Sequence, residues 1–426
     1  MLILSRRWII FLTASMLYFV GYFHRVSITV IVEDLMKEFS ASATSLGIFS
    51  SFYFYSYALM QIPAGLLIDK LGSRKTLTIF CFVASIGTLI FSLSPSLSYA
   101  TFSRLIIGFG VSVAFLSTVK LIASWFNARS FASLIGILVA MGNVGALLAS
   151  APLALMVIGL GWRLSFFSIA FATFALTGLI WLIVKDTPMA NENNSNELDS
   201  NSSYKDRKDR NMFSGVLQSI KTKDFWLIAF PPLFFFGSFI SLQGLWGVQF
   251  VMQIFALSKV EASIIVMMMS IGFSIGALFW GIVSDRLPVS RKNIYLFGLI
   301  LYVSAWLCLT LFRYVPISPW LHALFFFLGF FFGVIPISVA MVKSLFPLKI
   351  MGAATGTANA LPFVGGALYP LLFGYILDVF GLERIEEDVR IYSSASYELG
   401  FMVCLFSLIF ATGMIFFIKN KKNSIQ

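Results

Sequence analysis

The sequence predicts an all-α membrane protein whose twelve transmembrane helices form two pseudo-symmetric six-helix bundles. Three observations predict this fold class: an apolar composition, apolar stretches long enough to cross a bilayer, and a pattern that recurs in the two halves of the chain. Of the 426 residues, 59% are hydrophobic and 12% are charged. Soluble domains carry about 25% charged residues, so the composition excludes an ordinary soluble enzyme.

The apolar segments of the chain are long enough to cross a membrane, which takes about 20 residues. The first segment runs from Trp8 to Val32 and follows Arg6 and Arg7. Because a signal peptide has an apolar region of only about 7–15 residues, we predict an uncleaved first span. The predicted spans are 8–32, 44–68, 76–94, 99–123, 131–157, 163–184, 225–254, 261–284, 294–313, 320–343, 351–378 and 396–418.

A polar stretch divides the chain into two domains. Residues 185–223 are poor in apolar side chains and rich in Asn, Ser, Lys and Asp. A segment of this composition cannot bury enough apolar surface to fold, so we predict a disordered cytoplasmic linker. It separates an N-terminal six-helix bundle, residues 1–184, from a C-terminal six-helix bundle, residues 224–426.

The positive charges predict the orientation in the membrane. A net charge of +11 raises the question of nucleic acid, but the basic residues gather at the ends of apolar segments, which membrane topology explains better. The short loops and tails hold thirteen Lys and Arg residues on the side of the termini and six on the other side. Cytoplasmic loops are the more basic ones, so we expect both termini inside a cytoplasmic (inner) membrane.

The sequence offers no pattern for a metal or a cofactor. Cys81, Cys308 and Cys404 are isolated within apolar segments, and the chain has two His residues. This spacing fits neither a metal site nor a disulfide framework. We therefore expect no metal and no cofactor. A membrane-embedded enzyme would need a nucleophile with its base, or metal ligands, so an enzyme is not predicted.

Several features of the first half recur in the second half in the same order. Gly65 and Asp69, at the end of the second span, return as Gly281 and Asp285. The other matches are Trp8 with Trp226, Gly110-Val111 with Gly333-Val334, Val119-Lys120 with Val342-Lys343, and Gly136 and Gly145 with Gly356 and Gly365. Such a duplicated unit is a recurrent plan of transporters, which place the solute between the halves near the middle of the membrane.

The segment Gly65-Leu-Leu-Ile-Asp69-Lys70-Leu-Gly72-Ser-Arg74-Lys75 is the strongest local signal. Glycine lets two helices approach closely, and an Asp beside basic residues at a membrane boundary pairs charges or meets a helix dipole. The alternative is a basic loop that only sets topology. The segment resembles the signature between spans 2 and 3 of the major facilitator superfamily, which implies a conformational latch. The implied latch residues are Gly65, Asp69, Gly72 and Arg74, with a partial copy at Gly281, Asp285 and Arg286.

Other segments resemble the same superfamily over the whole chain apart from the linker. They are Arg104-Leu-Ile-Ile-Gly108-Phe-Gly110, Lys120-Leu-Ile-Ala-Ser-Trp125-Phe126 and Gly161-Trp162-Arg163-Leu-Ser-Phe166. Tyr22-Phe23-His24-Arg25 and Gly244-Leu245-Trp246-Gly247 resemble the sugar-phosphate permease branch of the anion:cation symporters, and similar features occur in amino-acid and dipeptide carriers. The resemblance implies a secondary transporter that works by alternating access.

Arg25 is the leading candidate for solute binding. It lies well inside the first span, where a cation costs at least ~2.5–3.5 kcal/mol. By resemblance it matches the phosphate-binding arginine of glycerol-phosphate transporters; the alternative is a structural Arg paired with a neighbouring helix. The second arginine of that family would fall near Ile240, yet the seventh span has no Arg or Lys. This difference favours a singly charged or zwitterionic solute over a phosphate.

Aromatic and amide side chains of two spans are expected around Arg25. Tyr53, Tyr57 and Gln61 follow one another at a spacing of four residues, so they share one helix face, which either lines a cavity or packs against a helix. Gln243 and Trp246 of the seventh span are the expected lining residues from the other half.

Four further polar residues near Arg25 have open roles. His24 is either a proton-sensitive site or a packed, neutral side chain. Arg104 is expected to organise helices or to contact the solute. Glu33 and Asp34 lie at the outer end of the first span and are the candidates for coupling to protons.

The predicted function is secondary transport of a small polar organic solute, namely an organic anion, an amino acid or a small peptide. The alternatives are an organophosphate antiporter and a transporter-like sensor that binds a solute without moving it. The expected partners are the solute, a coupling proton or counter-solute, and the bilayer, with no nucleic acid. We expect a monomer, and symport, antiport and uniport all remain open.

Overall fold

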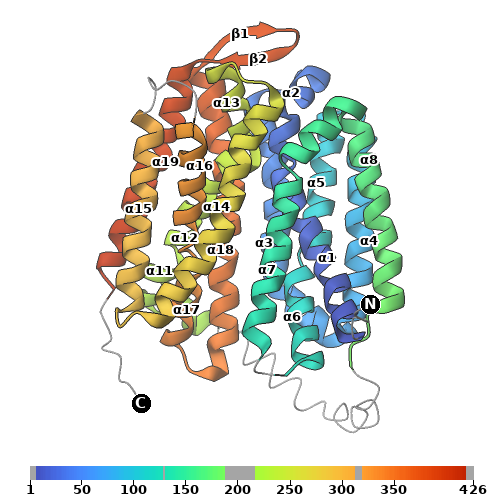
Figure 1. Cartoon of the computed structure of the whole chain (residues 1–426), viewed down its shortest axis with the longest axis vertical. Helices are drawn as coiled ribbons and strands as arrows, with labels where there is room; N and C mark the ends of the chain where they lie inside the picture. The colour runs from blue at the N-terminus through green and yellow to red at the C-terminus, as the bar shows by residue number, and fades with distance from the viewer. Residues whose placement is uncertain (1–5, 128–129, 188–215, 312–318, 419–426) are drawn as a thin grey trace.

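The computed structural model describes residues 6–127, 130–187, 216–311 and 319–418. Figure 1 shows two groups of helices side by side, one from each half of the chain. Helix α1 begins and helix α19 ends near one end of the molecule, where α8 also leads into the linker; we call this the linker end. A two-stranded hairpin marks the opposite end, which we call the hairpin end (Figure 1).

The first half forms eight described helices. They are α1 (Arg6–Val26), α2 (Ile28–Phe39), α3 (Ala43–Leu71), α4 (Ser73–Ser92), α5 (Leu97–Val111), α6 (Ala114–Trp125), α7 (Phe131–Leu148) and α8 (Ala151–Ile183). Helix α8 contains a kink at Gly161, whose φ of +76° is open to glycine without steric cost. The kink therefore separates the predicted fifth and sixth spans.

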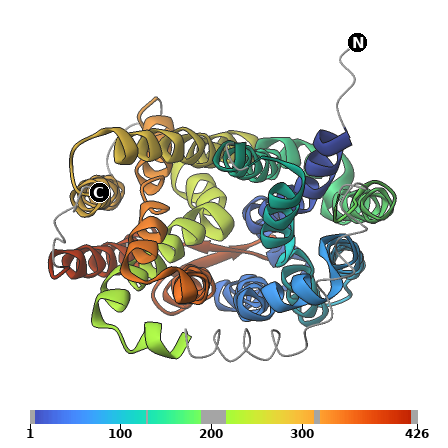
Figure 2. The same cartoon turned by 90° about the horizontal axis from the view of Figure 1, so that it is seen from below.

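The second half repeats this arrangement with more interruptions. Its elements are α11 (Lys223–Ala229), α12 (Pro231–Ile240), the π-helix η3 (Ser241–Trp246), α13 (Gly247–Phe255), α14 (Lys259–Arg286), α15 (Arg291–Leu311), α16 (Pro319–Phe332), α17 (Ile337–Leu345), α18 (Leu348–Phe380) and α19 (Ser394–Phe416). The seventh span is thus α11 to α13, with a π-helical turn in its middle. Seen along the long axis (Figure 2), the two halves occupy opposite sides of the molecule.

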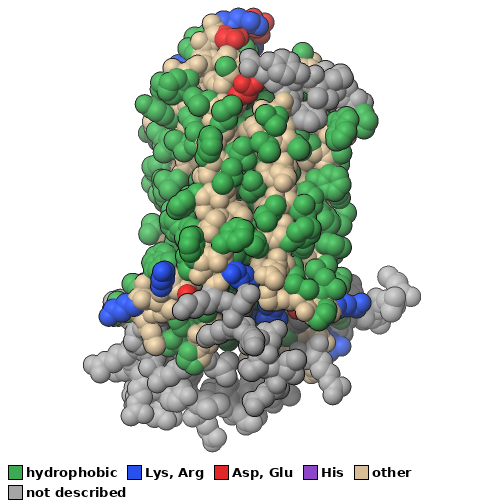
Figure 3. All heavy atoms as spheres, turned by 90° about the vertical axis from the view of Figure 1, so that its left-hand side faces the viewer, with side chains coloured by type: hydrophobic (Ala, Val, Ile, Leu, Met, Phe, Trp, Pro, Cys, Tyr) green, Lys and Arg blue, Asp and Glu red, His purple; other side chains and the backbone are tan. Residues whose placement is uncertain are grey.

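The predicted fold class is confirmed. Ten helices of the described residues are long and apolar enough to cross a membrane, and α7 supplies a shorter apolar helix over Ser133–Leu148. Helix α3, with 29 residues, completes the twelve spans. Figure 3 shows apolar side chains over the middle of one face, with charged side chains gathered toward its two ends. The chain is a multi-pass membrane protein.

The linker predicted over 185–223 lies only partly within the described residues. Residues 188–215 are outside them. At the edges the structure departs from the prediction of disorder, because Trp125 donates to the Lys185 carbonyl at 2.8 Å and residues 216–220 are helical. The side chain of Asp186 accepts a 2.9 Å hydrogen bond from the Arg74 amide. Local contacts with the first bundle therefore order the start of this polar stretch.

The loop after α18 is a β-hairpin, which sequence reasoning did not predict. Strands β1 (Leu382–Glu386) and β2 (Val389–Tyr392) pair antiparallel, with Glu386 opposite Val389. The two connecting residues, Glu387 and Asp388, both have positive φ angles of 45° and 65°. Two central residues with positive φ match the right-handed twist of paired strands, which is why so short a turn closes the hairpin.

Helices α3 and α18 form a close contact between the halves. A Cβ at Gly47 would lie 2.6 Å from the Leu371 Cα, and a Cβ at Gly374 would lie 2.3 Å from the Ala43 carbonyl oxygen. The hydroxyl of Ser51 also donates to the Ala367 carbonyl across this contact. The two glycines allow the backbones to approach, so the halves touch without intervening side chains.

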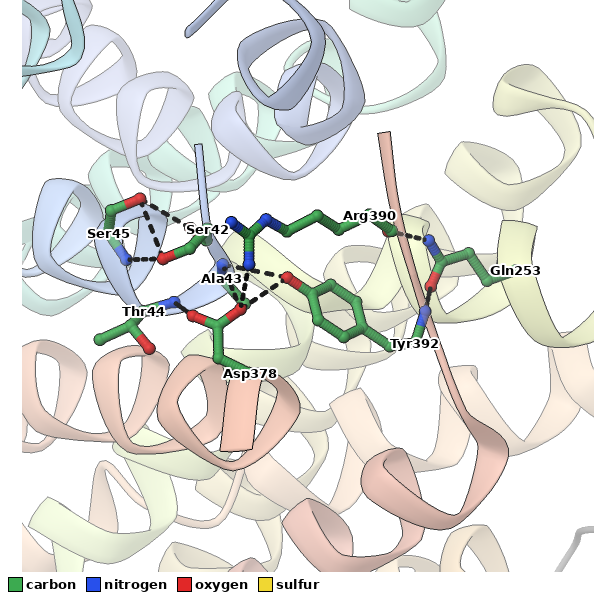
Figure 4. A network of polar contacts seen from close by, with 8 residues as sticks. All are labelled: Ser42, Ala43, Thr44, Ser45, Gln253, Asp378, Arg390 and Tyr392. Atoms are coloured by element: carbon green, nitrogen blue, oxygen red, sulfur yellow. Dashed lines mark hydrogen bonds and ion pairs between the residues drawn. The ribbon is translucent and has the colours of Figure 1, made fainter. Parts of the chain in front are cut away.

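The hairpin end of this contact is closed by a polar network (Figure 4). Asp378 of α18 accepts hydrogen bonds from the backbone N–H groups of Ala43 (3.1 Å) and Thr44 (2.7 Å), in the first turn of α3. Tyr392 of β2 donates to Asp378 at 2.9 Å, and Arg390 lies 3.5 Å from the same carboxylate. A carboxylate at the positive end of a helix dipole is stabilising, so Asp378 ties the two halves together.

Two ion pairs also join the halves at the hairpin end. Lys259 of α14 lies 2.7 Å from Asp34 of α2, and Lys37 of α2 lies 2.9 Å from Glu387 in the hairpin turn. The first pair is mostly buried and the second is exposed. Together with Asp378, the mostly buried Lys259–Asp34 pair holds the hairpin end shut in this structure.

Candidate solute-binding site

A small cavity lies between the two halves, midway along the spans. Its volume is about 40 Å³, which is room for only a few water molecules. Its lining comes from α1, α7, α12, η3, α14 and α16, and consists of Tyr22, Arg25, Val26, Asn143, Ala146, Phe236, Phe239, Ile240, Gln243, Phe273 and Phe332.

Arg25 is the positive charge of this cavity. Its guanidinium lies over the rings of Tyr22 (4.4 Å), Tyr57 (4.8 Å) and Phe363 (5.1 Å). The side chain is 6% exposed, and among the described residues it forms no ion pair, while its Nε has no hydrogen-bond partner. The π-faces offset part of the cost of burying the charge. The charge itself stays available to an anion.

The end of α1 that carries Arg25 is held by two other helices of the first half. Tyr53 of α3 donates to the Gly21 carbonyl at 2.8 Å, and Arg104 of α5 donates to the His24 carbonyl at 3.0 Å. Both carbonyls belong to the last turns of α1, next to the break at Ser27. Side chains that satisfy backbone groups near a helix end fix its position, so these contacts aim Arg25 at the cavity.

The π-helical turn of the seventh span lies against Arg25 from the other half. A Cβ at Gly244 would lie 2.9 Å from the Arg25 carbonyl oxygen, so glycine allows this approach. Gln243 faces the cavity and donates to Ser270 at 2.9 Å. Ile240, near which the resemblance would place a second arginine, also lines the cavity. π-helical turns are frequent at functional sites.

The structure separates the expected lining residues into three groups. Tyr57 stacks on Tyr53 and reaches Arg25, so both tyrosines support it. Gln61 lies farther along α3 and accepts a 3.3 Å hydrogen bond from Asn359 of α18. Trp246 points toward α18 instead, where its indole N–H donates to the Pro370 carbonyl at 3.0 Å.

His24 is turned away from the cavity into the first bundle. It is fully buried, its Nε2 lies 3.1 Å from the Thr88 hydroxyl, and its ring contacts Phe166. Arg104 is buried beside it, over the ring of Tyr53 at 4.7 Å. The structure therefore brings Arg104 to the support of α1 and does not bring His24 to the cavity.

The two coupling candidates lie at the hairpin end. Asp34 and Glu33 are 2.7 Å and 3.8 Å from the Lys259 ammonium. They pair with Lys259 between the halves, and within the described residues neither forms an ion pair with Arg25. Among the described residues, no three His, Cys, Asp or Glu side chains gather as metal ligands would.

The residues of the predicted latch lie at the linker end. Asp69 pairs with Lys120 at 3.0 Å, and Arg74 donates to the Trp181 carbonyl and lies over its ring. Gly72 has a φ of +80°, which explains a glycine at this turn. These contacts all join elements of the first half.

The close helix approach expected at the latch glycines is not present in this structure. Among the described residues, a Cβ at Gly65 or at Gly281 would have no atom of a neighbouring element within 4 Å. In the second copy, Asp285 lies 3.7 Å from Arg291 and both side chains are largely exposed. The glycines that do permit close approach are others, such as Gly108, where a Cβ would lie 2.2 Å from the Tyr53 carbonyl oxygen.

Sequence reasoning missed several lining residues. Tyr22 lies three residues before Arg25 and so faces the same side of α1. Asn143 is a 4% exposed amide side chain within a largely apolar span, and such a residue in the sequence indicates a polar site inside the membrane. The phenylalanines of the second half gave no such signal, because the chain has 47 of them.

The model of the Major Facilitator Superfamily matches residues 11–247 and again residues 233–425. The chain belongs to the major facilitator superfamily. The resemblance seen in the sequence is thereby confirmed, and the protein is a secondary transporter of this superfamily.

The chain is similar to two relatives that are named as transporters, and it shares its fold with a solved structure. The chain is 24% identical over 400 residues to a probable sulfoacetate transporter of Cupriavidus necator, covering 91% of this chain and 88% of the relative. It is 24% identical over 396 residues to a probable galactarate/D-glucarate transporter of Escherichia coli, covering 87% and 88%. The crystal structure of a D-xylose–proton symporter superposes with a TM-score of 0.76 at 15% identity, covering 98% and 99%.

Proposed function

We propose that this transporter carries a small organic acid across the cytoplasmic membrane, with Arg25 as the anchor for its carboxylate. The observation that carries the proposal is a buried guanidinium that faces the cavity between the halves and has no ion pair among the described residues. An anion would supply the missing counter-charge. The relatives named for sulfoacetate, galactarate and D-glucarate support an acidic solute, although each of these acids carries two negative groups.

The structure fits one closed state of an alternating-access cycle. The cavity of about 40 Å³ has room for only a few water molecules, and the hairpin end is shut by Asp378 and Lys259. A solute therefore enters only after the halves separate. With both termini and the linker in the cytoplasm, the hairpin end faces outward. The chain acts as a carrier without covalent chemistry.

A single cation favours an acid with one negative group over a phosphate ester. Ile240 occupies the place near which a second arginine would complete a phosphate clamp, and it lines the cavity. A doubly charged phosphate would have only Arg25 as counter-charge there. This supports organic-acid transport over organophosphate exchange.

Counterflow in proteoliposomes tests the proposal. Accumulation of a radiolabelled monocarboxylate, driven by the same unlabelled acid inside, is expected in the wild type. Arg25→Gln should weaken binding roughly 10- to 100-fold, since hydrogen bonds to charged groups contribute ~1.5–3 kcal/mol. Lys37→Gln, which removes a positive charge far from the cavity, is the matched control. Unchanged transport in Arg25→Gln, or binding without counterflow, would refute the proposal.

A further inference from the structure

The two walls of the cavity differ in chemistry. The first half contributes hydrogen-bonding and charged side chains, namely Tyr22, Arg25 and Asn143. The second half contributes four phenylalanines, Phe236, Phe239, Phe273 and Phe332, which we call the Phe wall. A solute held between the halves therefore meets a charge on one side and aromatic rings on the other.

The Phe wall is one continuous aromatic surface. Phe239 and Phe332 stack with ring centroids 4.0 Å apart and planes 7° from parallel. The ring centroid of Phe273 lies 5.3 Å from that of Phe332, and the ring centroid of Phe236 lies 6.4 Å from it. Phe236 and Phe273 are only partly buried, so their rings are the ones that a solute would contact.

The Phe wall offers few partners to hydroxyl groups. Among the described lining residues of the second half, Gln243 is the hydrogen-bonding side chain, and its amide group already donates to Ser270. A hydroxyl that leaves water to face an apolar ring, without a new partner, weakens binding about tenfold. A polyhydroxylated acid would pay this cost several times over, whereas an apolar body would not.

Charge narrows the class of solute further. Arg25 is the cation among the described lining residues, and it lies on the first-half wall. A carboxylate bound to Arg25 points the rest of the solute toward the Phe wall. A second negative group at the far end would face aromatic rings, whose π-faces are themselves negative.

We propose that the solute is a monocarboxylate with an apolar, ring-bearing body, whose carboxylate binds Arg25 and whose ring packs on Phe236 and Phe273. The inference rests on the proposed function, because it assumes that Arg25 anchors a carboxylate. It departs from the polyhydroxylated diacids after which the Escherichia coli relative is named. The specificity-determining residues are those of the Phe wall.

A comparison of three acids tests the solute class. Binding of phenylacetate, gluconate and glucarate to the purified protein is measured by competition and by counterflow in proteoliposomes. Phenylacetate and gluconate both carry one carboxylate, so they differ only in the uncharged part of the molecule. Glucarate adds a second carboxylate. Phenylacetate is expected to bind at least about tenfold more tightly than gluconate. Glucarate is expected to bind more weakly still.

Substitutions in the Phe wall test the contact itself. Phe273→Leu should weaken phenylacetate binding about threefold to tenfold, the range of an aromatic pair, and should leave gluconate binding unchanged. Phe236→Leu is a second variant with the same expectation if Phe273→Leu folds poorly. Phe171→Leu is the matched control, because this side chain on α8 is 71% exposed.

The outcomes separate the inference from the proposed function. Tighter binding of gluconate or glucarate, lost in Arg25→Gln and insensitive to the Phe wall, overturns the inference and leaves the carboxylate anchor in place. Binding of all three acids that ignores Arg25→Gln overturns the proposed function, and the inference with it. If none of the three acids binds, the proposed function and the inference are both overturned. Phenylacetate binding that depends on both Arg25 and Phe273 supports both.

Discussion

The carboxylate of Asp378 caps the first turn of α3 from the opposite half, accepting a 2.7 Å hydrogen bond from the Thr44 amide. This contact joins α18 to α3 at the point where the halves close the hairpin end (Figure 4). Tyr392 donates to the same carboxylate; burial and the neighbouring Asp378 raise the pKa of Tyr392, so its hydroxyl stays protonated. Asp378 is thus one of the contacts that close the hairpin end, and it acts there as a helix cap.

Asp378→Asn should loosen the hairpin end. The amide keeps the shape but loses the charge that interacts with the α3 dipole and Arg390, a loss of about 1 kcal/mol, or roughly fivefold in the ratio of closed to open forms. Spin labels at Ser98 and Leu382, in a background without native cysteines, measure the distance across this end. Asp285→Asn, an exposed carboxylate of the linker end, is the control. An unchanged distance distribution in Asp378→Asn would show that the cap does not set closure.

Lys37→Gln should leave the same distance distribution unchanged. Lys37 and Glu387 are both largely exposed, and such pairs contribute little to stability. The hydrogen bond from Lys37 lowers the pKa of Glu387. The small contribution of the pair to stability is therefore complete above the ordinary Glu pKa, and it is lost as the pH falls through the lowered pKa. The spin-label distances of the wild type and Lys37→Gln, compared at neutral pH where the pair is formed, check the prediction. A wide opening of Lys37→Gln at neutral pH would contradict it.

Gly108→Ala and Gly65→Ala should have opposite effects on stability. A Cβ at Gly108 would lie 2.2 Å from the Tyr53 carbonyl oxygen, so α3 and α5 must separate, at a cost of about 1–3 kcal/mol. A Cβ at Gly65 meets nothing within 4 Å in the described part of the chain, and alanine favours the helix by up to about 1 kcal/mol. Thermal unfolding of the purified variants in detergent compares them. Equal midpoints would mean that the helix contact at Gly108 is not as close as described.

Asn143→Leu should weaken binding of the acid without loss of the fold. Asn143 lines the cavity with Arg25, and its amide is the second donor we expect for the carboxylate. Loss of a hydrogen bond to a charged group predicts roughly tenfold weaker binding or more. Val144→Ala, at the neighbouring residue that is 43% exposed, is the control. Equal affinity of the two variants would remove Asn143 from the site.

A cation inside a span is costly wherever its neighbours lie, so the sequence alone makes Arg25 a candidate for the site. The structure places Arg25 at the cavity between the halves, and its role in binding a solute stays a prediction. Gly72 and Gly244 belonged to local patterns, and both occupy positions where the backbone requires glycine or a close approach. The position of His24 did not follow from its sequence neighbour. Arg25 faces the cavity, but the next side chain on a helix points in another direction, so His24 contacts Thr88 instead.

The sequence by itself determined the twelve spans, the duplicated halves and the superfamily, because apolar length, charge at span ends and short motifs are local properties of the chain. Only the tertiary structure decided what surrounds Arg25. Asn143, Phe273 and Phe332 come from three different helices, and their approach depends on how the halves pack. The cap that Asp378 places on α3 also depends on the tertiary structure, because Asp378 and Thr44 lie more than three hundred residues apart in the chain. Contacts of such separation leave no periodic trace, and side-chain packing alone selects them.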